Sequence, residues 1–548
     1  MVKVSTDKIK GFLTQTQDSI LSAAFIISLL YFVSATLGLF KSRILVSYFG
    51  TSPELSIFFI ADRIPSAIYS TIFLGSLSTV FIPIFVKISK ESKEKSYQYA
   101  SNLFNLVLIF FLVLSALIYL FSKEILFLIT LGKLSLSELD MASNLLNVML
   151  LGQLILIFSS FLTSILNARR NFLIPSLAPV VFNLVFLIAV PLLYPFQGIY
   201  SAAWGMVIAS VFHLLIQVPS FIAHKFEWKM LINIKDKDVT QSFKLSLSSF
   251  MATVVSQLIL LVESSLSLLI SSASVIYFKF SDQLRYFPVH LFGASIAAAA
   301  LPILATESED NIEVFVKTVK TSLLQIIYLS LPVSVLLIVL KIPLVRIVYG
   351  ADKFTWEDTV STAFCLGIFS LSIFSQSCNI FLSKCFYALK NTTIPLIGSL
   401  ITLLVTAAFP IYFIYSGYEV WVVVLGFVVG TYVNLAYFLL KLSRKVHSFS
   451  LRELFLPLGK ILFSGLVMSV FLYFPMQYLD NYVFNTTYVV NLLLLTGIVS
   501  LVGFGIYTAI SFWFRVPEVM LIFKILRKFR IKTSRLENLE NQLNQSIS

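Results

Sequence analysis

Two charged residues stand three apart in the apolar stretch FSDQLRYFP, residues 280–288. At this spacing Asp282 and Arg285 share one face of a helix, so their side chains can form an ion pair. A charge at the centre of a bilayer costs on the order of 3 kcal/mol, and such residues pair or face a polar interior. Two interpretations are open: a structural ion pair that holds a helix bend near Pro288, or one wall of a binding cavity.

Few other strongly ionisable residues lie within apolar stretches, and they are Lys41, Arg43, Asp62, Arg63, Glu263 and Lys279. Lys and Arg form charge-assisted hydrogen bonds with phosphate groups. Lys41, Arg63 and Arg285 therefore predict a cationic cavity for an anionic substrate. Arg43 lies near Gly50, so it has the alternative of extending to the outer headgroups. The carboxylates of Asp62, Glu263 and Asp282 leave coupling to a proton or a cation open.

The composition places these charges in a membrane protein. The chain has 548 residues, is 58% hydrophobic and 12% charged, and has a mean hydropathy of +0.91. Soluble domains are about half apolar and a quarter charged. Only helices can fill many successive spans of about 20 residues, because isolated strands leave backbone groups unpaired in hydrocarbon. The sequence thus predicts an all-α polytopic protein.

We expect fourteen transmembrane helices. Their approximate apolar runs are 20–47, 56–86, 102–122, 144–168, 173–194, 199–223, 242–270, 274–304, 319–342, 360–387, 393–415, 420–441, 458–477 and 487–514.

The charge pattern predicts the orientation of the chain. The formal net charge is +13, but the basic residues lie in short segments between apolar runs, which argues against nucleic-acid binding. Alternate connections are rich in Lys and Arg, and by the positive-inside rule they and both termini are cytoplasmic. Residues 516–548 form a basic cytoplasmic tail that we expect to contact anionic lipid headgroups.

An internal repeat divides most of the chain. The segment ARRNFLIP begins at Ala168 and ALKNTTIP begins at Ala388, a shift of 220 residues, and the same shift places Asp62 on Asp282. Each copy holds six helices, so both have one orientation, as in transporters with parallel repeats. We expect an N-terminal lobe at 1–230, a C-terminal lobe at 231–450, two additional helices at 451–515 and the tail at 516–548.

Motifs for enzyme chemistry are absent from the sequence. It holds no phosphate-binding loop, no HExxH motif and no credible grouping of a nucleophile with a base. Cys365, Cys378 and Cys385 match neither a metal site nor a disulfide framework. The sequence predicts no enzyme activity and no cofactor, and it leaves metal binding undetermined.

Three segments resemble the bacterial lipid II flippase family (MurJ/MviN type). They are GLFKSRILVSYFG, SIFFIADRIPSAIYSTIFLGSLSTVFIPIF and SASVIYFKFSDQLRYFP. This family belongs to the superfamily of multidrug, oligosaccharidyl-lipid and polysaccharide exporters. The resemblance implies two six-helix lobes, two extra helices that form a groove for the lipid tail, and a central cationic cavity. It also implies translocation of a polyprenyl-pyrophosphate-linked peptidoglycan precursor across the bacterial cytoplasmic membrane by alternating access.

The resemblance also implies site residues. Lys41 stands where the family has an arginine. The positive charge is kept, but the guanidinium group that can bind an anion through two parallel hydrogen bonds is lost. Arg63 and Asp282 match the family pattern, whereas Gln283 stands at a family arginine, and whether Arg285 replaces it is open. The predicted substrate-binding residues are Lys41, Arg43, Arg63 and Arg285; those predicted for the cavity or for coupling are Asp62, Glu263, Asp282 and Gln283.

The expected partners are a lipid-linked anionic glycan, membrane lipids, a coupling ion (Na⁺ or H⁺) and enzymes of cell-wall synthesis. Two alternatives stay open: an exporter of another lipid-linked oligosaccharide, and a non-transporting scaffold for cell-wall enzymes.

Overall fold

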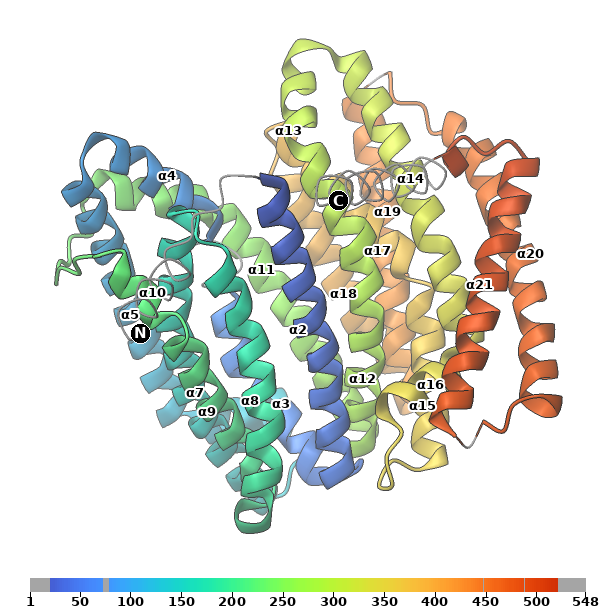
Figure 1. Cartoon of the computed structure of the whole chain (residues 1–548), viewed down its shortest axis with the longest axis horizontal. Helices are drawn as coiled ribbons and strands as arrows, with labels where there is room; N and C mark the ends of the chain where they lie inside the picture. The colour runs from blue at the N-terminus through green and yellow to red at the C-terminus, as the bar shows by residue number, and fades with distance from the viewer. Residues whose placement is uncertain (1–19, 72–77, 447, 487, 521–548) are drawn as a thin grey trace, which may run out of the picture. The chain divides into compact units, whose positions relative to one another are not determined.

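A computed structural model describes residues 20–71, 78–446, 448–486 and 488–520, and every regular element in them is a helix (Figure 1). The first repeat contains α2 (Ile20–Phe49), α3 (Pro53–Tyr69), α4 (Ser78–Glu91), α5 (Lys93–Leu120), α6 (Ser122–Ile129), α7 (Leu136–Ala168), α8 (Leu173–Gln197), α9 (Tyr200–Leu215) and α10 (Val218–Ala223).

The second repeat contains α11 (Lys237–Ile270), α12 (Ser272–Val289), the π-helical turn η2 (His290–Ala294), α13 (Ser295–Asp310), α14 (Ile312–Val339), α15 (Lys341–Tyr349), α16 (Trp356–Ser370), α17 (Ile373–Ala388), α18 (Thr393–Tyr415) and α19 (Trp421–Lys445). Two further helices follow, α20 (Arg452–Tyr482) and α21 (Val489–Trp513).

The helix boundaries confirm the repeat. Helix α5 starts at 93 and ends at 120, and α14 starts at 312 and ends at 339, a shift of 219 at both ends. Helix α7 runs from 136 to 168, and α16 with α17 runs from 356 to 388, a shift of 220. The helices α20 and α21 lie outside this pattern, as expected.

The turn that recurs in the two copies of the repeat, at Arg170 and Lys390, has the same backbone geometry in both. Arg170 and Lys390 have φ values of 59° and 55° although neither is glycine. In each copy the next amide closes the helix: Asn171 N–H donates to the Leu166 carbonyl at 3.0 Å, and Asn391 N–H to the Phe386 carbonyl at 2.9 Å. This is the Schellman motif, whose hydrogen bonds satisfy carbonyl groups at the helix end and offset the cost of the left-handed conformation at a non-glycine residue.

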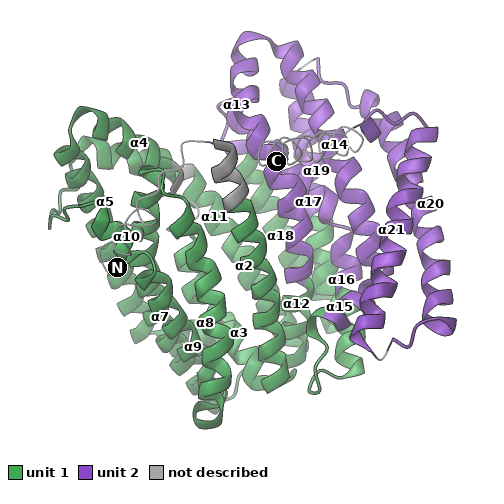
Figure 2. Cartoon of the chain, viewed as in Figure 1, with its two compact units in different colours: residues 1–281, 348–365, 395–430 green, residues 282–347, 366–394, 431–548 purple. Residues whose placement is uncertain are grey.

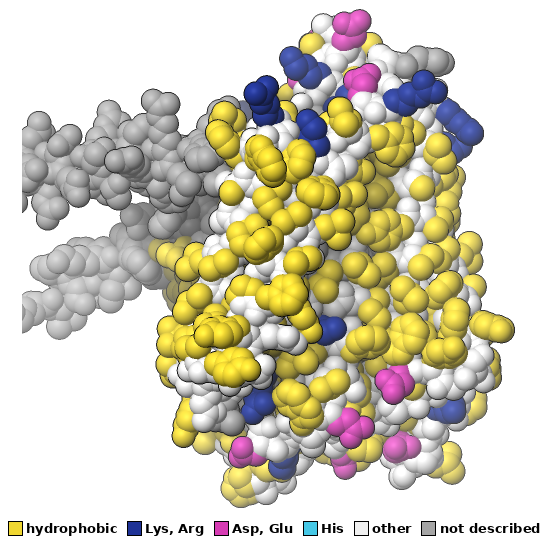
Figure 3. All heavy atoms as spheres, turned by 90° about the vertical axis from the view of Figure 1, so that its right-hand side faces the viewer, with side chains coloured by type: hydrophobic (Ala, Val, Ile, Leu, Met, Phe, Trp, Pro, Cys, Tyr) yellow, Lys and Arg dark blue, Asp and Glu magenta, His cyan; other side chains and the backbone are white. Residues whose placement is uncertain are grey.

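The spans agree with a multi-pass membrane protein. Within the described residues, twelve helices are long and apolar enough to cross a bilayer, and the pair α16–α17, bent by 45°, makes a thirteenth. The remaining expected run, 56–86, corresponds to α3 and α4, and residues 72–77 between them lie outside the described part. Figure 3 shows one face on which hydrophobic side chains form a broad band, with most charged side chains gathered above and below it.

The contacts divide the chain into two compact units (Figure 2). Unit 1 comprises residues 1–281, 348–365 and 395–430, and unit 2 comprises 282–347, 366–394 and 431–548. The boundary falls inside α12, after Ser281. The lobe boundaries that the sequence suggested stay a prediction, and most of the predicted tail, 521–548, lies outside the described residues, as do residues 1–19.

Small residues let the last two helices pack closely within unit 2. A Cβ atom at Gly465 of α20 would approach Leu331 of α14 to 2.8 Å, and one at Gly503 of α21 would approach Leu472 of α20 to 2.4 Å. Close backbone approach at small residues is a usual way for membrane helices to associate. Helix α20 is thereby held on α14 of the second repeat.

Candidate functional site

Lys41 lies on α2 in unit 1, against two aromatic rings of α8. Its Nζ is 4.6 Å from the ring centre of Phe186 and 5.4 Å from that of Phe182. Among the residues that the structure describes, no carboxylate lies within salt-bridge distance of this ammonium, although Asp62 is near enough to act on it electrostatically. Cation–π contacts of this kind are worth about 2 kcal/mol when desolvated, which offsets part of the cost of the buried charge.

Asp62 and Arg63 are placed by α3, whose start is fixed by the Ser52 cap and by Pro53 in the first turn. Ser66 donates to Asp62 Oδ1 at 3.0 Å one turn along the same helix. Arg63 Nε donates to the Ser264 hydroxyl of α11 at 2.8 Å. Both side chains are half-buried, and the arginine donates its hydrogen bond to a neutral hydroxyl.

Glu263 and Arg43 complete the predicted residues of unit 1. Glu263 precedes Ser264 on α11 and is 1% exposed. Arg43 is half-buried on α2, and its backbone carbonyl accepts a hydrogen bond from Ser47. The structure thus brings Lys41 and Asp62 near one another and joins Arg63 to the helix that carries Glu263.

In unit 2, the sequence prediction of an Asp282–Arg285 ion pair is confirmed. The arginine is 4% exposed and has two further partners: its Nη1 donates to Gln376 Oε1 at 2.8 Å, and its guanidinium lies 4.4 Å from the ring centre of Phe369. A carboxylate, an amide and an aromatic ring therefore hold this guanidinium. This geometry supports the structural interpretation of the pair, whereas Gln283, one residue on, is partly exposed.

The ion pair lies just before a change in helix type. Pro288 is inside α12, and the chain then forms the π-helical turn η2. A Cβ atom at Gly293 of this turn would lie 2.7 Å from Ser377 Cα of α17, next to Gln376. In the first repeat, Ser70 and Thr71 begin the same π-helical pattern 220 residues earlier. Such turns often mark functional sites or bends.

A further buried carboxylate, Asp358, was not predicted from the sequence. This residue is 4% exposed, and its Oδ1 accepts hydrogen bonds from the hydroxyls of Thr51 at 3.0 Å and Tyr277 at 2.6 Å. Its Oδ2 accepts from the amide and the hydroxyl of Thr355, each at 2.8 Å. We call Thr51, Tyr277, Thr355 and Asp358 the Asp358 cluster; it joins segments of both repeats, and all four residues belong to unit 1.

A signal for this cluster was present in the sequence. Thr355 and Asp358 have the spacing of a capping box before α16, and Ser135 and Glu138 form a capping box 220 residues earlier, before α7. The equivalence of the boxes is readable from the repeat. The further hydrogen bonds from Thr51 and Tyr277 to the second capping box could not be predicted from the repeat.

The described residues hold no group of three or more His, Cys, Asp or Glu side chains that could bind a metal. The three cysteines are buried free thiols.

Comparison with known proteins gives the family. The family model described as "Lipid II flippase MurJ" matches residues 45–499, which is most of the chain. The chain belongs to the MurJ lipid II flippase family.

Individual relatives agree with this membership. A protein of Buchnera aphidicola subsp. Acyrthosiphon pisum named "Probable lipid II flippase MurJ" is 28% identical over 462 residues, covering 82% of this chain and 88% of that protein. A protein of Aquifex aeolicus with the same name is 26% identical over 433 residues, covering 78% and 84%.

Solved structures agree as well. The lipid II flippase MurJ in an inward closed conformation aligns with a TM-score of 0.73 and 25% identity, covering 90% of this chain and 99% of that one. An inward-facing multidrug resistance MATE family transporter of the MOP superfamily aligns with a TM-score of 0.61 at 16% identity, covering 76% and 95%, and shows a shared fold. The resemblance and the helical fold expected from the sequence are therefore confirmed.

Proposed function

We propose that this protein translocates lipid II, the polyprenyl-pyrophosphate-linked peptidoglycan precursor, from the inner to the outer leaflet of the bacterial cytoplasmic membrane. Family membership and the names of the relatives support this substrate. We place both termini in the cytoplasm, since the basic connections predict that orientation. Membership of a flippase family also favours transport without enzyme activity.

One observation carries the proposal: two cations of unit 1, Lys41 on α2 and Arg63 on α3, contact neutral groups. Lys41 lies over aromatic rings, and Arg63 donates to a serine hydroxyl. A cation retained at such cost without a carboxylate at salt-bridge distance is available to an anionic group. A pyrophosphate offers oxygens for charge-assisted hydrogen bonds from both side chains, and we assign it to Lys41 and Arg63, with Arg43 as a further cation.

The carboxylates have a separate role in this proposal. We assign coupling to Na⁺ or H⁺ to Asp62 and Glu263, because both lie on the helices that carry or contact Arg63. Asp282, with Gln283 beside it, belongs to the structural pair with Arg285 in unit 2, and the anion-binding side chains that we assign belong to the first repeat.

Alternating access gives the Asp358 cluster a role. The cluster joins the α2–α3 turn of the first repeat to α12 and α16 of the second, within unit 1. Opening between the repeats on this side must break the hydrogen bond of Thr51 to the carboxylate, whereas the bond of Tyr277 lies within the second repeat. The cluster thus stabilises the state in which this end is closed.

Complementation of a flippase-depleted bacterium tests the function, scored by the accessibility of lipid II at the outer leaflet. We expect Lys41→Ala and Arg63→Ala each to abolish export while the protein still inserts, and Lys41→Arg to retain it. Lys384→Ala is the matched control, because Lys384 is also a half-buried lysine over an aromatic ring, 5.5 Å from the centre of Tyr387. Unimpaired export by both alanine variants would refute the assignment of the cations.

The same assay separates the alternatives. We propose cell-wall enzymes as partners. If a variant that exports no lipid II still restores growth, the alternative function as a scaffold for these enzymes is favoured. Normal export of a different lipid-linked oligosaccharide, with no lipid II export, would favour the related exporter.

A further inference from the structure

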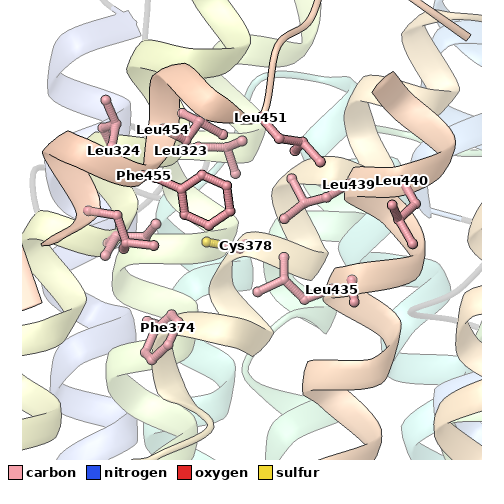
Figure 4. A pocket seen from close by; sticks show the side chains of 13 residues that line it. Leu323, Leu324, Phe374, Cys378, Leu435, Leu439, Leu440, Leu451, Leu454 and Phe455 are labelled. Atoms are coloured by element: carbon pink, nitrogen blue, oxygen red, sulfur yellow. The ribbon is translucent and has the colours of Figure 1, made fainter. Parts of the chain in front are cut away.

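An apolar cavity of about 310 Å³ lies among membrane helices of unit 2 (Figure 4). Its lining comes from α14, α17, α19 and α20 and from the segment that leads into α20. Phe374 and Cys378 belong to α17, Leu435 and Ala436 to α19, and Leu451 and Phe455 to the entry of α20. The volume is at the lower end of the range for small-molecule sites, about 300–1,000 Å³.

The lining excludes a polar ligand. All the described side chains that line the cavity are leucine, isoleucine, alanine, phenylalanine or cysteine, and none comes from α21. Leu440 and Phe455 of this lining are exposed on membrane helices. A flexible hydrocarbon chain from the bilayer is the occupant that this chemistry and this location favour, because burying it removes apolar surface without leaving a polar group unpaired.

Basic residues stand at one end of this cavity. Lys320 lies one turn before the lining residues Leu323 and Leu324, Lys441 follows Leu440, and Arg452 follows Leu451. We call Lys320, Lys441 and Arg452 the basic rim. Figure 3 shows basic side chains gathered above the hydrophobic band of this side of the molecule.

The rim carries an excess of positive charge. Lys320 Nζ lies 2.7 Å from Glu453 Oε2 and 5.7 Å from the ring centre of Phe449. Its side chain is only 16% exposed, whereas that of Glu453 is 62% exposed. Arg452 is exposed, and Lys441 is half-buried. The basic rim thus holds three cations, of which Lys320 contacts the carboxylate of Glu453.

We propose that this cavity binds one acyl chain of an anionic glycerophospholipid of the surrounding bilayer, with its phosphate against Lys320 and Arg452. The cavity supplies the apolar surface, and the rim supplies charge-assisted hydrogen bonds to the phosphate. Such a lipid fills the space between α19 and α20 and stabilises the packing of α20 on the second repeat. The lining residues all belong to unit 2, whereas the proposed anion-binding cations belong to unit 1, and the lipid site does not depend on the transported substrate.

Native mass spectrometry of the detergent-purified full chain tests the site. The probes are phosphatidylglycerol and phosphatidylcholine with identical palmitoyl and oleoyl chains. We expect phosphatidylglycerol to bind at least about tenfold more tightly, because two or three cations act on its net charge. The double variant Lys320→Gln/Arg452→Gln should lose this preference and keep the weak binding of phosphatidylcholine.

A cavity-filling variant tests the acyl-chain position. Ala436→Phe places a ring in the cavity and should lower the affinity for phosphatidylglycerol about tenfold or more. Ala116→Phe is the matched control, because Ala116 is also exposed and lines another cavity, of about 440 Å³, in unit 1. This control should leave the phosphatidylglycerol affinity within about twofold of the unmodified chain.

A measurement on the unmodified chain tests the site without depending on whether the variants fold. Cys378 lines the cavity, so bound phosphatidylglycerol should slow its alkylation by N-ethylmaleimide, and phosphatidylcholine at the same concentration should not. Equal affinity for the two lipids, unchanged binding by Ala436→Phe, or no protection of Cys378 would overturn the proposal. Tighter binding of undecaprenyl phosphate than of phosphatidylglycerol at this cavity would also overturn it, by assigning the cavity to the tail of the substrate.

Discussion

Replacing Asp358 by alanine should loosen the end of the molecule where α2, α12 and α16 meet. The carboxylate is 4% exposed and accepts four hydrogen bonds, two from Thr355 and one each from Thr51 and Tyr277. The Asp358→Ala variant removes all four acceptor contacts and leaves their donors in place. The same change also removes one half of the capping box of α16.

The magnitude follows from the donors left behind. A buried donor without its acceptor costs about 1–3 kcal/mol, and hydrogen bonds to charged groups are worth about 1.5–3 kcal/mol each. The contributions are not additive, since both hydroxyls can rotate toward other acceptors and Thr355 is exposed. We therefore expect a loss of about 3 kcal/mol, which raises the local opening equilibrium about 150-fold.

Alkylation of Cys365 measures this opening. The thiol is 0% exposed and lies seven residues after Asp358 on α16. With Cys378 and Cys385 replaced by alanine, a small maleimide reports on Cys365 alone. When reclosing is faster than alkylation, the observed rate is proportional to the opening equilibrium. Asp358→Ala should therefore speed the reaction about 150-fold.

Two controls make the result interpretable. Asp352→Asn changes an exposed carboxylate of the same loop and should leave the rate of Cys365 alkylation unchanged. Asp358→Asn keeps one acceptor oxygen and should give only about a fivefold increase, equivalent to about 1 kcal/mol. If Asp358→Ala and Asp352→Asn react at the same rate, the Asp358 cluster does not hold this end closed.

Three further outcomes are expected. Burial raises the pKa of Glu518, which follows α21. The folded protein therefore loses stability as the pH rises through the native pKa, because the side chain must then carry its charge in a buried place. Glu518→Gln should therefore raise the thermal unfolding midpoint at pH 8 and flatten its dependence on pH between about 4.5 and 8. Gly293→Ala should lower the free energy of unfolding by about 1–3 kcal/mol, because the added methyl group meets the Ser377 backbone; an unchanged denaturation midpoint would contradict the close packing. Arg285→Lys keeps the charge but loses the planar guanidinium whose two terminal nitrogens donate separately to Asp282 and Gln376, so it should lower the unfolding midpoint more than Lys384→Arg does.

Much of the architecture was predictable because its signals are local or periodic. Hydropathy gave the spans, since a bilayer-crossing helix must be apolar over about 20 residues. The turns at Arg170 and Lys390 gave the repeat, and the helix boundaries confirm it. The Asp282–Arg285 pair was predictable because three residues is nearly one helical turn, so both ends of the contact belong to one helix.

The surroundings of each charge were decided by the tertiary structure. No spacing rule joins Lys41 to Phe186, Arg285 to Gln376, or Asp358 to Thr51, because each contact links helices or turns that are far apart in the sequence. These contacts depend on how helices pack and rotate, which is set by the fit of many side chains together. The sequence by itself therefore determined which charges enter the membrane; the packing determined that Lys41 and Arg63 keep neutral partners, whereas Arg285 is held by its own carboxylate.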